Sequence, residues 1–162
     1  MTEPTAVITP GSAPAADALV PPMFPGGMLV DEREAEALAA VIARKCLFRY
    51  YGPGEGPREV ELFEAEWRQA FDTPYALCLN AGSSALIGAL VGLGATEGTE
   101  VIVPAYTWNA TANAVLAAGA LPVIAEVDES LTLDPADVEA RITPRTRAIL
   151  PVHMRGGACD MD

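Results

Sequence analysis

The sequence has few positively charged residues. Its 162 residues include 22 Asp and Glu but 10 Lys and Arg, which gives a formal net charge of -12. Surfaces that bind nucleic acids or anionic membranes usually have the opposite balance, because they must attract a polyanion. We therefore expect neither partner. A small anion at a buried site stays compatible with this charge, since local backbone donors outweigh a distant net charge.

Cysteine and long apolar runs are also scarce. The cysteines are Cys46, Cys78 and Cys159, and no two of them form a C-x-x-C pair. This spacing predicts neither a disulfide framework nor a zinc site. No apolar run approaches the roughly 20 residues of a membrane helix, and the N-terminus has no cationic segment leading into an apolar one. We expect no membrane span, no signal peptide, no metal, and a location in the reducing cytoplasm.

Three regions of the sequence differ in composition and periodicity. Residues 1–22 are rich in Pro, Ala, Ser and Thr without periodicity, which predicts a flexible tail. Residues 23–74 form an N-terminal helical arm with an entrance loop: amphipathic helices are expected at 31–46 and 58–71, with the loop at 47–57. Residues 75–162 alternate between short apolar strands and helices. The strands are expected at 75–80, 100–104, 122–127 and 147–153, and the helices at 83–94, 108–120 and 134–142.

This alternation predicts an α/β fold. Strands that are apolar throughout are typical of a mostly parallel sheet with helices on both faces. In such sheets ligands bind at the carboxyl ends of the strands, where helix N-termini present free N–H groups. Three strand ends are therefore candidate sites.

The first strand end suits a phosphate group. In "NAGSSAL", Gly82 lets the backbone approach a ligand closely, and Ser83 or Ser84 can donate a hydroxyl hydrogen bond. This turn has neither the GK[ST] of a Walker loop nor the G-x-G-x-x-G of a dinucleotide fold. The alternative is that Ser83 only caps the following helix.

The second strand end suits a flat ligand. In "PAYTWNATANAV", Tyr106 and Trp108 can present an aromatic face, although aromatic residues at a helix start often serve packing alone. A planar, phosphorylated cofactor would satisfy the first two strand ends together. At the third end His153 and Arg155 are candidates whose roles the sequence leaves open.

These motifs resemble one known family. "NAGSSAL", "PAYTWNATANAV" and "ITPRTRAILPVH" are similar to blocks of the DegT/DnrJ/EryC1/StrS family of sugar aminotransferases, over roughly residues 24–162. The resemblance implies the N-terminal portion of a fold type I transferase large domain, with pyridoxal 5'-phosphate (PLP) as cofactor and a homodimer with shared active sites. It places Gly82, Ser83 and Ser84 at the cofactor phosphate and Trp108 on the pyridine ring. The Phe48–Gly52 loop matches a segment near the mouth of the family's active site.

The resemblance also implies an activity and shows what this sequence lacks. Family members transfer an amino group from glutamate or glutamine to a keto-sugar or keto-cyclitol that is often nucleotide-linked, and they hold PLP on a lysine. Lys45 is the single lysine here and is expected on a solvated helix end, so no catalytic residue is assigned. The lysine is expected from a missing C-terminal segment or a complementary chain, in a homodimer or hetero-oligomer. The alternative is a non-catalytic module that binds PLP or another phosphate ligand, or an inactive fragment.

Overall fold

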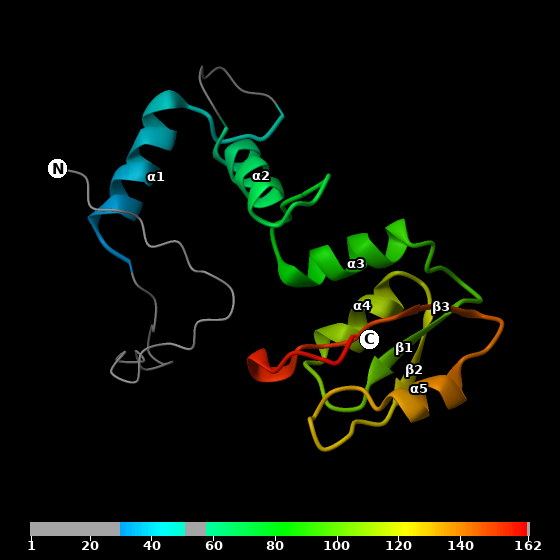
Figure 1. Ribbon diagram of the computed structural model, residues 1–162. Coiled ribbons are helices and arrows are strands. Elements are labelled where there is room, and N and C mark those ends of the chain that lie inside the picture. The colour runs from blue at the N-terminus through cyan, green and yellow to red at the C-terminus, as the bar shows by residue number, and fades with distance from the viewer. Residues whose placement is uncertain (1–29, 51–57, 162) are drawn as a thin grey trace, which may run out of the picture. The chain divides into compact units, whose positions relative to one another are not determined.

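The computed structural model describes residues 30–50 and 58–161 (Figure 1). The chain divides into two compact units, Met1–Leu62 and Phe63–Asp162. The predicted tail at 1–22 and part of the Phe48–Gly52 loop lie outside the described residues. The predicted boundaries at residues 22 and 74 stay predictions.

The first unit contains helix α1 (Glu32–Arg44) and the start of helix α2 (Glu59–Ala70). Helix α1 begins with a capping box, in which the Asp31 carboxylate accepts the Arg33 N–H at 2.9 Å and the Glu34 carboxylate accepts the Asp31 N–H at 2.7 Å. Lys45 ends the helix in the left-handed conformation, with φ of 56°. Both predicted amphipathic helices are confirmed, and each is shorter than predicted.

The second unit is built on a three-stranded parallel sheet. The strands are β1 (Glu100–Pro104), β2 (Leu121–Ala125) and β3 (Thr146–Ile149), in the order β2-β1-β3. Strand β1 is central, and Ile102 pairs with Val123 on one side and Ile149 on the other. All five residues of β1 are buried, as expected for a largely apolar strand covered on both faces.

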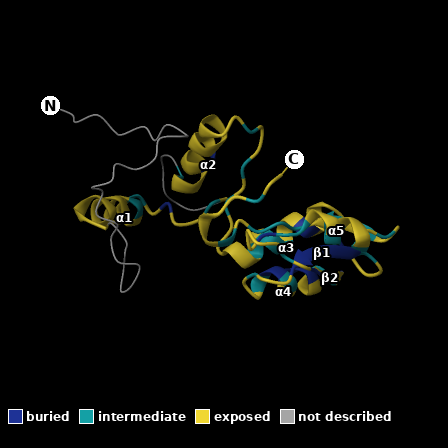
Figure 2. Ribbon diagram, turned by 60° about the horizontal axis from the view of Figure 1, so that its bottom comes forward, coloured by how far each residue is buried: buried dark blue, intermediate teal, exposed yellow. Residues whose placement is uncertain are grey.

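Helices cover both faces of this sheet. Helix α3 (Gly82–Gly92) and helix α4 (Ala110–Ala117) pack together on one face, over Val101 and Val103. Helix α5 (Pro135–Arg141) packs on the opposite face, and Figure 2 shows α4 and α5 on opposite sides of the buried strands. The chain moves from β1 to β2 in one direction and back across β1 to β3 in the other, so right-handed crossovers place α4 and α5 on opposite faces. The predicted α/β architecture is confirmed.

The predicted strand at 75–80 is wrong, and so is the predicted total of four strands. Residues 75–79 belong to no helix and form no ladder with any described strand. Tyr75 is 85% exposed and Leu77 is 64% exposed. An apolar segment becomes a strand only when a neighbouring strand accepts its backbone hydrogen bonds. The last predicted strand, 147–153, also ends early, at Ile149, although β1 continues beside it to Pro104.

Predicted helix ends were corrected by one to three residues. Helix α3 begins at Gly82 instead of residue 83, and α4 begins at Ala110 instead of residue 108. The start of α5 is confirmed: Asp134 is its N-cap, accepts the Ala136 N–H at 2.9 Å, and precedes Pro135 in the first turn. None of the helices in the described part of the chain is both long and apolar enough to cross a membrane.

A buried carboxylate fixes the start of β1. The Glu100 side chain is 4% exposed, and it accepts hydrogen bonds from the Thr143 hydroxyl at 2.5 Å and from the Arg145 guanidinium at 2.8 Å. These bonds, first that of Thr143 and then that of Arg145, hold the pKa of Glu100 below its ordinary value of 4.5. Glu100 thus ties the central strand to the loop before β3, at the sheet edge opposite the candidate sites.

Glu100 is expected to make stability depend on pH in the acid range. Because its pKa is lower in the folded chain, the unfolded chain binds more protons below pH 4.5, so stability falls as the pH drops. We expect Glu100→Gln to be less stable than the wild type at pH 7 and to lose less stability between pH 5 and about pH 3. Urea unfolding at a series of pH values measures both effects. Glu97→Gln, at an exposed position nearby, is the control and should keep the wild-type slope; an unchanged slope in Glu100→Gln would contradict this role.

Candidate functional site

The first turn of α3 is an uncapped helix N-terminus. Its N-cap is Ala81, which has no side chain able to accept a hydrogen bond, and Gly82, Ser83 and Ser84 follow as the first helical residues. The alternative that Ser83 caps the helix is therefore wrong, because Ser83 lies inside the first turn. The first N–H groups of a helix have no acceptor within the helix, and they carry partial positive charge. This turn can therefore bind an anion.

Space is open in front of this turn. A Cβ atom added to Gly82 would meet no atom within 4 Å. The Ser83 side chain is exposed and Ser84 is half-buried, so both hydroxyls lie in the first turn beside the free amides. Backbone donors, two hydroxyls and open room are the features that a phosphate group requires.

Helix α3 runs antiparallel to the strands. Its C-terminal end lies beside the start of β3, where the Arg147 guanidinium donates a hydrogen bond to the Leu93 carbonyl. At about 1.5 Å per residue the helix is as long as a short strand. Its first turn therefore lies toward the edge where the strands end, and Figure 1 shows β1 pointing to the same side as the start of α3.

Trp108 occupies this same edge of the sheet. It follows β1, and its side chain is 75% exposed. Its backbone is held in place, because the Trp108 carbonyl accepts the Thr111 N–H at 3.0 Å and the Thr107 and Thr111 hydroxyls lie 2.8 Å apart. The structure thus combines a fixed main chain with an open indole face, which suits stacking on a flat ring.

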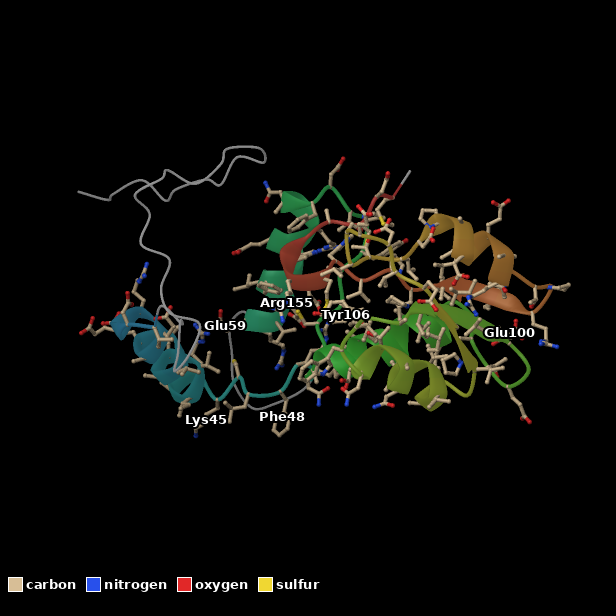
Figure 3. The ribbon with its side chains drawn as sticks, turned by 90° about the horizontal axis from the view of Figure 1, so that it is seen from below. Lys45, Phe48, Glu59, Glu100, Tyr106 and Arg155 are labelled. Carbon is tan, nitrogen blue, oxygen red and sulfur yellow. The ribbon has the colours of Figure 1, made fainter. Side chains whose placement is uncertain are left out.

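Tyr106 and Arg155 also lie at this end. Figure 3 shows both on the side of the second unit opposite Glu100. Arg155 is exposed in a short turn, Met154–Gly156, where its φ is 52°. The His153 imidazole accepts the Cys159 N–H at its Nδ1 atom, at 3.0 Å, so this histidine fixes the loop after β3.

Neither a lysine nor a set of metal ligands is found among the described residues of the second unit at this edge. Lys45 is exposed at the end of α1 in the first unit, as expected for a solvated residue (Figure 3). Within residues 30–50 and 58–161, no three His, Cys, Asp or Glu side chains gather as metal ligands would. The edge formed by the α3 first turn and Trp108 is thus equipped for binding, but it holds no amine nucleophile among the described residues of its unit.

Two supporting residues were missed in the sequence. Thr111 is buried at the start of α4, and Glu64 is the only buried residue of α2. The sequence contains a signal for Glu64. It lies four residues after Val60 and three before Trp67, on the apolar stripe of the predicted helix, where a carboxylate is unusual.

The fold and this edge together define the class of protein. Solved aminotransferase structures share this fold, which is that of type I PLP-dependent enzymes. The model of the DegT/DnrJ/EryC1/StrS aminotransferase family matches residues 28–162. The chain belongs to this family, as its motifs predicted.

Individual relatives are similar over most of this chain. The dTDP-3-amino-3,4,6-trideoxy-alpha-D-glucose transaminase of Streptomyces venezuelae is 48% identical over 82% of this chain and 34% of its own length. The GDP-perosamine synthase of Caulobacter vibrioides is 47% identical over 62% of this chain and 28% of its own. The crystal structure of NtdA from Bacillus subtilis with its bound cofactor PMP superposes with a TM-score of 0.70 at 31% identity. The superposition covers 82% of this chain and 30% of the NtdA chain. The chain thus spans about a third of the length of the relatives it matches.

Proposed function

We propose that this chain is the N-terminal part of a PLP-dependent aminotransferase that transfers an amino group to a nucleotide-linked keto-sugar or keto-cyclitol. The observation that carries the proposal is the uncapped, open first turn of α3 at the sheet edge that also bears Trp108. Family membership supports the transaminase class, and the two relatives named for nucleotide-linked sugars support the substrate class.

Different residues of this chain bind different parts of the cofactor. The amides of Gly82, Ser83 and Ser84, with the two serine hydroxyls, hold the cofactor phosphate. Trp108 presents its indole to the pyridine ring and orients it. When bound, PLP supplies the electron sink that amino-group transfer needs. These residues bind and orient, and none of them moves a proton.

The lysine that anchors the cofactor must come from elsewhere. Lys45 is the only lysine of the sequence and belongs to the first unit. We assign the anchor to a C-terminal segment or to a complementary chain, in a homodimer or hetero-oligomer in the cytoplasm, with glutamate or glutamine as amino donor. The exposure of apolar residues on α3 supports such a partner: this helix is apolar on all sides, yet Leu90 is its only buried residue, and Val91 is exposed.

A second candidate function follows from the single lysine of the sequence, Lys45, which belongs to the first unit. A chain whose second unit has the phosphate cradle and Trp108 but no lysine can act as a non-catalytic module that binds PLP or another phosphate ligand. The two candidates agree on binding and differ on chemistry.

An assay with and without the neighbouring coding sequence tests the proposal. The chain is purified alone and after co-expression with the sequence encoded directly downstream, and amino transfer from glutamate or glutamine to a nucleotide-linked keto-sugar is measured. We expect no transfer and no lysine-linked PLP absorption for the chain alone, and both for the co-expressed pair. Lys45→Ala should leave the pair active. A PLP band in the lone chain that disappears in Lys45→Ala would contradict the assignment of the anchor.

A further inference from the structure

Helix α2 has one buried residue, and that residue is an acid. Glu64 is 7% exposed, whereas Glu61 and Glu66 on the same helix are exposed. Burying a carboxylate is unfavourable unless hydrogen bonds replace its hydration. A helix that needed only apolar packing would have an apolar residue at this position. The acid therefore requires an explanation from its contacts.

The carboxylate of Glu64 holds a backbone amide. Its Oε1 atom accepts the Cys78 N–H at 2.6 Å, which is short for an N–H···O bond. Phe63, Trp67 and Leu77 line the hollow around this bond, and the Trp67 ring stacks on Phe71 with centroids 4.3 Å apart. An apolar surrounding strengthens such a bond, because water does not compete for the acceptor.

Cys78 lies in the segment that leads into the phosphate cradle. Residues 75–79 have no ladder with the described strands, so the Glu64 bond supplies a fixed main-chain attachment where a strand neighbour would otherwise do so. On its other side the segment packs on α3, where the Leu79 side chain lies 3.5 Å from the position of a Cβ on Gly88. The segment is thus held between α2 and α3.

This attachment sets the direction of the next residues. Three residues after Cys78 the chain reaches Ala81, the N-cap of α3, and Gly82 follows as the first helical residue. A chain segment this short transmits the position of the Cys78 amide to the first turn of α3. Loss of the attachment would let the Asn80–Gly82 turn, and with it the free amides of the cradle, move away from the phosphate position.

We propose that Glu64 is a positioning residue for the cofactor phosphate, acting through the Cys78 amide. The inference rests on the proposed function, since it needs a phosphate in the cradle. It assigns to α2 a role in cofactor binding although no atom of Glu64 touches the cofactor. The effect must therefore be specific to the phosphate and leave binding of the ring alone unchanged.

The test compares two ligands on four proteins. Pyridoxine 5'-phosphate has the ring and phosphate of the cofactor but no aldehyde, and pyridoxine lacks the phosphate as well; neither can react with Lys45. Dissociation constants are measured for the wild type, Glu64→Ala, Glu64→Gln and the control Glu66→Ala, together with amide hydrogen exchange at Cys78 and the thermal midpoint. A merely structural role would lower the midpoint and leave the preference for the phosphorylated ligand unchanged.

We expect Glu64→Ala to bind pyridoxine 5'-phosphate about tenfold more weakly and to exchange the Cys78 amide faster, with pyridoxine binding unchanged. Glu64→Gln, which keeps an oxygen acceptor, should retain most of the affinity, and Glu66→Ala should match the wild type. An unchanged phosphate preference in Glu64→Ala overturns the positioning role alone. No phosphate preference in the wild type overturns the proposed cradle itself. If Glu64→Ala does not fold, Glu64→Asp replaces it, and an undiminished phosphate preference in that variant overturns the inference.

Discussion

Gly82→Asp is expected to abolish the preference of the chain for a phosphorylated ligand. The new carboxylate would stand in the open space in front of the α3 first turn and repel the phosphate over a few ångströms. Like charges about 4 Å apart near a protein surface repel by several kcal/mol. We expect the dissociation constant of pyridoxine 5'-phosphate to rise about 100-fold, where each factor of ten is about 1.4 kcal/mol. Pyridoxine binding should change little.

The helix itself should tolerate this substitution. An acid in the first turn of a helix interacts favourably with the helix dipole, so the thermal midpoint of Gly82→Asp should not fall. Gly92→Asp is the matched control, because it introduces the same side chain at the other end of the same helix, also into open space. It should be slightly less stable and should keep the phosphate preference. Equal losses of phosphate affinity in both variants would point to net charge and contradict a local cradle.

Ile102→Ala is expected to cause the largest loss of stability. Ile102 is fully buried in the central strand and lies on the face opposite Val101 and Val103, toward α5. Removing a buried side chain of this size leaves a cavity and costs about 2–5 kcal/mol. Urea unfolding followed by circular dichroism measures the loss.

Ile124→Ala is the control for this core position. Ile124 lies on β2, pairs with Val103, and is 46% exposed, so the same truncation there should cost much less. If both variants lost equal stability, then burial in the central strand would not be what stabilises the second unit.

The sequence predicts elements well where one strand or helix contains its own signal. Strand β1 has five buried residues in a row, and Asp134 and Pro135 mark the start of α5. Each of these two elements can therefore be predicted from its own residues. Residues 75–80 have a similar apolar run but no neighbouring strand among the described residues. Pairing is a property of two segments, so the local pattern of one could not decide it.

In the candidate site, too, local features could be predicted from the sequence and contacts between distant segments could not. The first turn of α3, at Gly82–Ser84, and Trp108 could be singled out from their motifs, and the structure places both at the sheet edge where the strands end, while their roles in binding stay predictions. That Ala81 and not Ser83 precedes the helix depends on where α3 starts, and the predicted start was one residue late. Glu64 itself could have been noticed on the apolar stripe of its helix, but its partner could not be predicted, because that partner is a backbone amide 14 residues away and a backbone group leaves no sign in the sequence.

An amide-resolved NMR titration tests the phosphate cradle most directly. The labelled chain is titrated with pyridoxine 5'-phosphate, inorganic phosphate and pyridoxine. The two phosphate ligands should shift the amides of Gly82, Ser83 and Ser84 most strongly, and both ring-bearing ligands should shift the Trp108 indole N–H. Phosphate-dependent shifts that leave these three amides unmoved would contradict the assignment of the α3 first turn as the phosphate end of the cofactor site.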